Sequence, residues 1–364
     1  MKIRMILAAL ATLLFSTFVG AKVHSGIEVK VQAVKSQIDN DQDVLVKVSY
    51  KNRTGKAVKL LKWYLPDSEG NLEEGIFKIT RDGETVDYLG PHYKRPAPTD
   101  NDYLVLKANQ RVSYIADVSR YYDFSEQGYY QVGVSVENFE MFGTSKPGNG
   151  KSAQHLSKMA SLLNAEIYVS KVRAAKGKPC NPRKEDCGGD GGGNGGDISF
   201  TGSCSNSEQN AIISAVAAAK DMANDSVAYL NGSAGPRYTT WFGTYTSSRW
   251  NKVAGNFDAI KDALDNKSKT FDCGCNQQYF AYVYPNQPYK IYLCRAFWSA
   301  SMTGTDSKGG TIIHEMSHFN AVAGTDDIVY GQTGAKNLAI SDPNGATNNA
   351  DSHEYFAENT PNQN

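Results

Sequence analysis

The chain has 364 residues, enough for two domains with separate cores, and its 38 basic and 38 acidic residues balance to a formal net charge of zero. This balance gives no reason to expect nucleic acid or an anionic membrane as a partner. Basic residues prevail up to residue 187 and acidic residues prevail from 188 onward. Attraction between two oppositely charged halves is one reading of this asymmetry, and chance is the other.

The first residues have the pattern of a secretory signal peptide. Lys2 and Arg4 precede an apolar run from Met5 to about Phe18, and small residues follow up to Ala21. A membrane anchor needs about 20 apolar residues, and neither this run nor any other segment reaches that length. We therefore expect residues 1–21 to be removed and the protein to be secreted, with no membrane partner.

Six cysteines in an exported chain predict three disulfides. Cys180 and Cys187 flank a short polar segment and are spaced to close a small loop. Cys273 and Cys275 are separated by one residue, which disfavours a bond between them. Cys204 and Cys294 are then their partners, in either combination.

Residues 22 to about 140 have the pattern of an all-β, sandwich-like domain. Apolar residues alternate in 26–34, 43–50 and 129–136, and turn-forming residues separate these runs. The segment 151–175 has helical spacing followed by a short apolar run, and the first domain is expected to span 22–175. We interpret the histidines at positions 24, 92 and 155 as ordinary surface or packing residues.

Residues 176–199 form a polar, glycine-rich linker that a protease can reach. The glycines do not form a phosphate-binding loop, because the G-K-[ST] ending and a preceding apolar strand are missing. From residue 200 to 364 the pattern becomes α+β and helix-dominated. Helices are expected at 207–232, 248–266 and 306–322 and from Asp351 onward, with a β-hairpin within 277–298.

The segment His314-Glu315-Met316-Ser317-His318 carries the chemistry. On a helix, residues four apart share a face, so both imidazoles reach one metal ion, and Glu315 lies beside them as a general base. Buried apolar residues on the same helix and a stop at Gly324 support this placement. An unrelated surface helix with two histidines is the alternative.

A catalytic zinc takes three protein ligands and keeps one position open. The metzincin pattern is excluded, because Ala321 and Gly324 occupy its glycine and histidine positions. A thermolysin-like arrangement would use Glu354 or Glu358 from a later helix. Asp327 is nearer, nine residues after His318 and just past a glycine turn, and its neighbour Asp326 would point the other way.

The run from His314 to Gly331, H-E-x-x-H followed by G-T-x-D-x-x-Y-G, resembles the signature of the aspzincin family of deuterolysins and peptidyl-Lys endopeptidases. The resemblance covers residues 200–364 and implies a zincin catalytic domain with one Zn²⁺. It implies Asp327 as third ligand beside His314 and His318, Glu315 as general base and Tyr330 as donor to the developing oxyanion. The family's cysteine pattern implies the disulfides Cys204–Cys273 and Cys275–Cys294.

The lysine-specific members of this family imply a substrate-binding role for Asp351 and Glu354. These two acids lie three residues apart on the expected helix and would hold a lysine ammonium together. The alternative is a capping-box pair at the start of the helix. We interpret His353 between them as a packing or surface residue.

The linker contains lysines at positions 176, 178 and 184, and another lysine, at position 171, lies just before it. An enzyme that cuts before lysine would release itself there. We therefore expect residues 22–175 to be a propeptide that inhibits or chaperones the catalytic domain of a monomeric zymogen acting on proteins or peptides. The layout also resembles that of secreted Aeromonas exotoxin proteases, which implies a role in virulence.

Two alternatives stay open: a zinc peptidase with Glu354 as ligand and no lysine preference, and a non-enzymatic secreted binding protein built on the β-domain.

Overall fold

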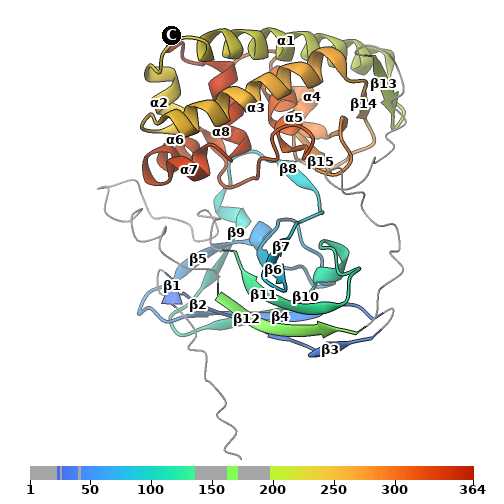
Figure 1. Ribbon diagram of the computed structural model, residues 1–364, viewed down its shortest axis with the longest axis vertical. Coiled ribbons are helices and arrows are strands. Elements are labelled where there is room, and N and C mark those ends of the chain that lie inside the picture. Colours follow the sequence, from blue (N-terminus) through green and yellow to red (C-terminus); the bar gives the residue numbers. More distant parts are fainter. Residues whose placement is uncertain (1–22, 25–26, 40–41, 136–161, 171–196) are drawn as a thin grey trace, which may run out of the picture.

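The structure is a computed structural model that describes residues 23–24, 27–39, 42–135, 162–170 and 197–364. Figure 1 shows a β-rich part from the N-terminal half of the chain and a helical part from the C-terminal half. The expected signal peptide, most of the glycine-rich linker and the expected Cys180–Cys187 bond lie outside the described residues. None of the described helices is long and apolar enough to cross a membrane.

Two sheets and a hairpin build the N-terminal part. The first sheet has the order β1 (Val23–His24), β2 (Ile27–Ala33), β4 (Leu45–Asn52) and β10 (Arg111–Asp117). The second has the order β3 (Gln37–Ile38), β12 (Leu162–Val169), β11 (Gly128–Val134), β6 (Phe77–Arg81) and β7 (Glu84–Val86). The hairpin pairs β5 (Val58–Leu61) with β9 (Tyr103–Leu106), and short 3-10 turns occupy Lys62–Tyr64, Asp100–Asp102 and Val118–Arg120.

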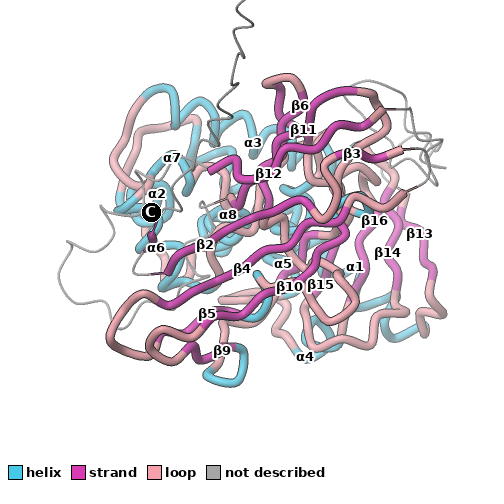
Figure 2. The backbone as a smooth tube through the Cα atoms, turned by 90° about the horizontal axis from the view of Figure 1, so that it is seen from below, coloured by secondary structure: helices cyan, strands magenta, loops and turns pink. Residues whose placement is uncertain are grey.

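The alternating apolar residues of these strands form one shared core, as expected for a sandwich. Val31 and Val48 face each other across β2 and β4, and both are fully buried. They belong to the same buried cluster as Val132 and Ile167 of the second sheet. Figure 2 shows β2, β4 and β10 side by side as one layer of this part. Within the segment of expected helical spacing, the described portion is the strand β12.

Eight helices and a small sheet build the C-terminal part. The helices are α1 (Asn206–Leu230), α2 (Pro236–Phe242), α3 (Ser247–Asn266), α4 (Arg295–Ser299), α5 (Lys308–His318), α6 (Gly331–Ser341), α7 (Pro343–Ala346) and α8 (Ala350–Glu358) among the described residues. The sheet has the order β13 (Ile198–Thr201), β14 (Lys269–Asp272), β16 (Lys290–Leu293), β15 (Ala281–Val283) and β8 (His92–Lys94). The expected α+β class and the antiparallel β15–β16 hairpin are therefore present.

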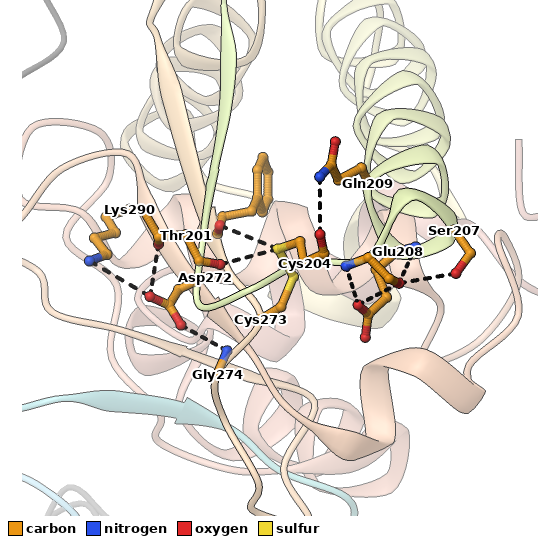
Figure 3. The surroundings of a disulfide bond; sticks show 11 residues. Thr201, Cys204, Ser207, Glu208, Gln209, Asp272, Cys273, Gly274 and Lys290 are labelled. Carbon is orange, nitrogen blue, oxygen red and sulfur yellow. Dashed lines mark hydrogen bonds and ion pairs between the residues drawn. A yellow bond between two sulfur atoms is a disulfide. The ribbon is translucent and has the colours of Figure 1, made fainter.

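Local sequence explains where the long helices begin. Ser205 and Glu208 form a capping box at the start of α1, because each side chain accepts a hydrogen bond from the other residue's backbone N–H. The disulfide Cys204–Cys273 joins the residue before this cap to the end of β14 (Figure 3). A second disulfide, Cys275–Cys294, follows directly. Both bonds that the family resemblance implied are formed.

Several elements were not predicted from the sequence. The strands β13 and β14 and four of the shorter helices are among them. Gly331 and Gly334 lie inside α6, and glycine weakens the helical signal of such a short segment. The expected helix at 306–322 ends earlier, at His318, because the chain reverses in a turn that ends at Gly324, whose φ is +58°.

The fifth strand of the C-terminal sheet comes from the N-terminal part. Strand β8 pairs antiparallel with β15, and Lys94 lies opposite Ala281 while His92 lies opposite Val283. Figure 1 shows β8 leaving the β-rich part to lie beside β15 under the helices. An exposed sheet edge accepts an extended peptide in this way through main-chain hydrogen bonds. This added strand brings residues 92–94 next to α5.

Candidate active site

Helix α5 holds three of the expected site residues in the core. Ser307 caps the helix, since its hydroxyl accepts a hydrogen bond from the Gly310 N–H at 3.0 Å. The apolar side chains of Ile312, Ile313 and Met316 are buried in the main core cluster of this part. The same helix leaves His314, Glu315 and His318 fully buried on its other side, facing β8 and the loop after Gly324.

Three unpaired ligand atoms meet at one point beside α5. Asp327 Oδ1 lies 3.1 Å from His314 Nε2 and 3.5 Å from His318 Nε2. Each of the three atoms is buried and has no hydrogen-bond partner in the described part of the chain. Two ligands on a tetrahedral zinc lie about 3.3 Å apart when each is about 2.0–2.1 Å from the ion. The residues therefore fit a zinc ion in both chemistry and spacing.

The chain reversal after α5 returns Asp327 to the helix. The Thr325 N–H donates a hydrogen bond to the Ser317 carbonyl at 3.1 Å, which folds the loop back along the last turn. His318 Nδ1 lies 2.8 Å from the Thr325 carbonyl, so its Nε2 is left free to face Asp327. Asp326 points elsewhere, as expected, and accepts a hydrogen bond from Asn348 Nδ2 at 2.7 Å.

Asp351 and Glu354 lie on the far side of the His314 ring from Asp327. Asp351 Oδ1 is 2.9 Å and Glu354 Oε2 is 3.2 Å from His314 Nδ1, whereas Asp327 is next to Nε2. Carboxylates at the second ring nitrogen of a ligand histidine fix its tautomer and orientation. This arrangement favours Asp327 over Glu354 as third ligand. Asn349 is at the N-cap position of α8 and forms no side-chain cap hydrogen bond, so Asp351 and Glu354 do not form the alternative capping box.

A buried lysine from the N-terminal part lies among these acids. Lys94 Nζ is 2.8 Å from Glu354, 3.1 Å from Asp351 and 2.9 Å from Asp306. Burial alone would lower the pKa of the ammonium, but Asp351 and Glu354 outweigh burial and raise this pKa well above its usual value. Asp351 and Glu354, the two acids expected to bind a substrate lysine, thus contact a lysine of the chain itself, together with Asp306, which was not predicted.

Glu315 faces the backbone of the same strand. Its Oε1 accepts a hydrogen bond from the Lys94 N–H at 3.3 Å, and its Oε2 is buried without a partner among the described residues. Burial raises the pKa of Glu315 to about 7, against the lowering influence of His314 and His318. A carboxyl group with such a pKa is suited to take up and return a proton near neutral pH.

Tyr330 is buried at the start of α6. Its hydroxyl donates a hydrogen bond to Glu74 Oε1 at 2.9 Å, and its ring packs edge-on against Trp63. Both of these contacts come from the N-terminal part. His353, as expected, is a packing residue, since its ring lies against Phe242 and Phe257.

Sequence reasoning missed the residues that the N-terminal part contributes. His92, interpreted as an ordinary surface or packing residue, is a packing residue, but its position beside the site was not predicted: its ring stacks on His318 with centroids 4.6 Å apart. Lys94 and Glu74 were not singled out. No spacing relates residues 74–95 to residues 314–354, so only the pairing of β8 with β15 brings them together.

Comparisons with known proteins identify the family of this chain. The family model described as lysine-specific metallo-endopeptidase (aspzincin) matches residues 228–358, which include every expected zinc and substrate residue. An extracellular protease of Aeromonas hydrophila is 45% identical over 98% of this chain and 98% of its own length. The chain belongs to the aspzincin family. It is therefore a zinc metalloendopeptidase, and the non-enzymatic alternative is excluded.

Other aspzincins extend the likeness. A peptidyl-Lys metalloendopeptidase of Grifola frondosa is 34% identical over 96% of this chain and 97% of its own length. One from Pleurotus ostreatus is 49% identical over 43% of this chain and 95% of its own length. A solved zinc peptidase from Grifola frondosa is 49% identical, covers 44% of this chain and all of its own, and gives a TM-score of 0.43.

Proposed function

We propose that this aspzincin is a secreted endopeptidase that cuts the peptide bond on the amino side of lysine. The Lys94 ammonium supports this specificity, since three carboxylates surround it and its side chain is fully buried. The fungal relatives are named peptidyl-Lys metalloendopeptidases, and the Aeromonas relative is named an extracellular protease. The N-terminal signal-peptide pattern is consistent with export.

Substrates bind, on this proposal, in the register of β8. A peptide that pairs with β15 as β8 does places its lysine between Asp351 and Glu354 and its preceding residue beside Asp327. The bond between those two residues corresponds to Tyr93–Lys94, whose N–H faces Glu315. Main-chain pairing positions any sequence, and the acidic pocket selects lysine.

His314, His318 and Asp327 would hold the zinc ion, which when bound polarises the peptide carbonyl and lowers the pKa of water. Glu315 takes the proton from the attacking water and passes it to the leaving amine, the atom that corresponds to the Lys94 nitrogen. Tyr330 donates a hydrogen bond to the oxyanion as negative charge develops there. This last role requires that Glu74 no longer accepts the Tyr330 hydroxyl.

We further propose that the chain is a zymogen and that its N-terminal part is the inhibitory propeptide. Strand β8 occupies the edge of β15 and Lys94 fills the acidic pocket, so no substrate can enter either. Cleavage before a lysine of the linker would separate the two parts in sequence, and release of β8 would then open the site.

The first experiment maps the cleavage sites of the processed C-terminal part on an unfolded protein by mass spectrometry, with and without a zinc chelator. Cuts before lysine that disappear with the chelator are expected. Asp351→Asn and Glu354→Gln should each reduce kcat/KM for lysine peptides at least tenfold, because a buried lysine ammonium then loses a charged partner. Asp327→Asn should lose zinc. Zinc retained in Asp327→Asn but lost in Glu354→Gln would establish the alternative ligand set instead.

A second experiment tests the zymogen. Alanine at Lys171, Lys176, Lys178 and Lys184 should keep the chain in one piece, and this uncut chain should be inactive on a short lysine peptide. In the uncut chain, Lys94→Ala should release activity, since the buried carboxylates of Asp351 and Glu354 and the half-exposed one of Asp306 lose their cation. Lys59→Ala, which removes an exposed surface pair with Asp100, is the matched control and should stay inactive. An uncut chain as active as the processed enzyme would contradict the zymogen proposal.

A further inference from the structure

His92 is held directly beside the candidate zinc ligands. It is the first residue of β8, opposite Val283 of β15, and 8% of its side chain is exposed. Its ring stacks on His318 at an interplanar angle of 30°, and Tyr88 packs edge-on against it with centroids 5.6 Å apart. The imidazole is therefore confined between the N-terminal part and α5.

A ligand atom of His92 lies near two of the three proposed zinc ligands, His318 and Asp327. Its Nδ1 lies 3.9 Å from Asp327 Oδ2. One nitrogen of His92, one of His318 and one carboxylate oxygen of Asp327 all lie within 4.8 Å of one another. Ligands of one zinc lie about 3.3 Å apart, so a ring movement of up to roughly 1.5 Å would bring His92 to the spacing of a ligand.

Hydrogen bonding does not account for the placement of this nitrogen. His92 Nδ1 is buried, and no group of the described chain forms a hydrogen bond with it. Asp327 Oδ2, the carboxylate oxygen nearest to it, accepts its hydrogen bond from the Tyr93 N–H at 3.0 Å. A buried polar atom without a partner is costly, and metal coordination satisfies an imidazole nitrogen.

We propose that His92 is the fourth zinc ligand of the uncut chain, with its neutral Nδ1 in the position that a catalytic site keeps for water. This inference rests on the proposed set of His314, His318 and Asp327. It involves no proton or electron transfer, since an uncharged nitrogen takes the place of an uncharged water molecule. When β8 leaves, His92 leaves with it and the position opens.

The ligation by His92 explains why a substrate-like strand is not cut. Lys94 fills the acidic pocket and its N–H faces Glu315, so the Tyr93–Lys94 bond lies where a substrate bond would lie. With His92 on the zinc ion, no position remains for the attacking water. The same segment is then an inhibitor because of one side chain two residues before the lysine.

The test uses the full chain with Glu315→Gln, which prevents self-cleavage and keeps an oxygen acceptor for the Lys94 N–H. His92→Phe retains a ring that can stack on His318 but has no ligand atom, and His24→Phe on β1 is the control. X-ray absorption fine structure of the zinc-loaded proteins counts the imidazoles on the ion. Three are expected in the parent and the control, and two in His92→Phe.

A second readout is the rate at which a chelator removes zinc from these proteins. Replacing groups that merely support zinc ligands costs about 10- to 100-fold in affinity, so loss of a ligand should speed zinc release at least tenfold. Equal imidazole counts and equal release rates in parent and His92→Phe would show that His92 only packs, and would overturn the inference. If Asp327→Asn in the same chain holds zinc as tightly as the parent, the proposed ligand set itself fails, whatever His92 does.

A crystal structure of the zinc-loaded Glu315→Gln chain provides a test that does not depend on the folding of a variant. His92 Nδ1 about 2.0–2.1 Å from the ion supports the inference. A water molecule bound to zinc beside an unligated His92 contradicts it.

Discussion

The Tyr330 hydroxyl donates a hydrogen bond to Glu74 Oε1 across the two parts of the chain, at 2.9 Å. Arg95 Nε lies 3.3 Å from the same oxygen, and burial raises the pKa of Glu74 well above its usual value although Arg95 opposes this. A residue that the proposed mechanism needs for the oxyanion is therefore held by the N-terminal part. Under the proposed mechanism, this contact would block the chemistry at a point separate from the lysine pocket and from the zinc ligands.

Glu74 and Glu73 form a matched pair for testing this contact. Both pair with Arg95, but Glu74 is buried and holds Tyr330, whereas the Glu73 side chain is 44% exposed. Truncating one partner of a buried charge pair costs about 2–5 kcal/mol, while exposed pairs contribute about 0–1 kcal/mol. In the uncut chain, Glu74→Ala should weaken the docking of the N-terminal part, so that β8 is released more often and peptidase activity rises at least tenfold, whereas Glu73→Ala should change activity less than threefold. Equal effects of the two variants would contradict the role of the Tyr330 contact.

Asp306 should contribute to lysine recognition less than its two neighbours do. It lies on the loop before α5 with φ of +52°, a conformation that asparagine also tolerates, so Asp306→Asn should keep the backbone in place. Its side chain is 40% exposed, and solvent weakens its attraction for the ammonium. We expect Asp306→Asn to lower kcat/KM for lysine peptides about three- to tenfold, measured on the processed enzyme. An effect as large as that of Asp351→Asn would show that solvent does not screen this site.

His353 should make the C-terminal part sensitive to acid. Burial lowers the pKa of His353 to about 4, although the Asn349 carbonyl partly opposes this. The folded chain then binds this proton less well than the unfolded chain does, so stability is lost as pH falls from about 6.5 to about 4. The loss at the low end amounts to roughly 3 kcal/mol.

The comparison variant is His353→Phe, which fits beside Phe242 and Phe257 but gives up the contact with Asn256. It should be less stable than the parent at pH 7, and its stability should fall less steeply between pH 6.5 and 4. Chemical unfolding of both zinc-loaded proteins across this range measures the difference between their free energies of unfolding. The titration of all other groups cancels in this difference. Parallel curves for the two proteins would refute the assignment.

The two disulfides of the C-terminal part should differ in their contribution to stability. Cys204–Cys273 closes a sequence separation of 69 and Cys275–Cys294 one of 19. Chain entropy then makes the first bond about 1 kcal/mol more stabilising than the second. Unfolding of the double alanine variants should show this order. The opposite order would indicate that packing around the fully buried Cys294 outweighs loop length.

The catalytic side of this site could be predicted from the sequence because its residues are related by local spacing. His314 and His318 lie one turn apart on one helix, and Asp327 follows after a reversal that ends at Gly324. The family signature added the roles of Glu315 and Tyr330. Hydrophobic periodicity was also sufficient to predict the long helices and the alternating strands, since each of these elements buries one of its faces.

The side of the site that we propose to be inhibitory was decided by tertiary structure alone. His92, Lys94 and Glu74 lie more than 200 residues before their partners, and nothing in their neighbourhood distinguishes this lysine from the other lysines of the chain. The pairing of β8 with β15 brings His92 and Lys94 into the site. Glu74 reaches Tyr330 from another segment of the N-terminal part. Spacing along a helix specifies geometry within one element, whereas contact between a strand and a distant sheet edge depends on how both parts fold.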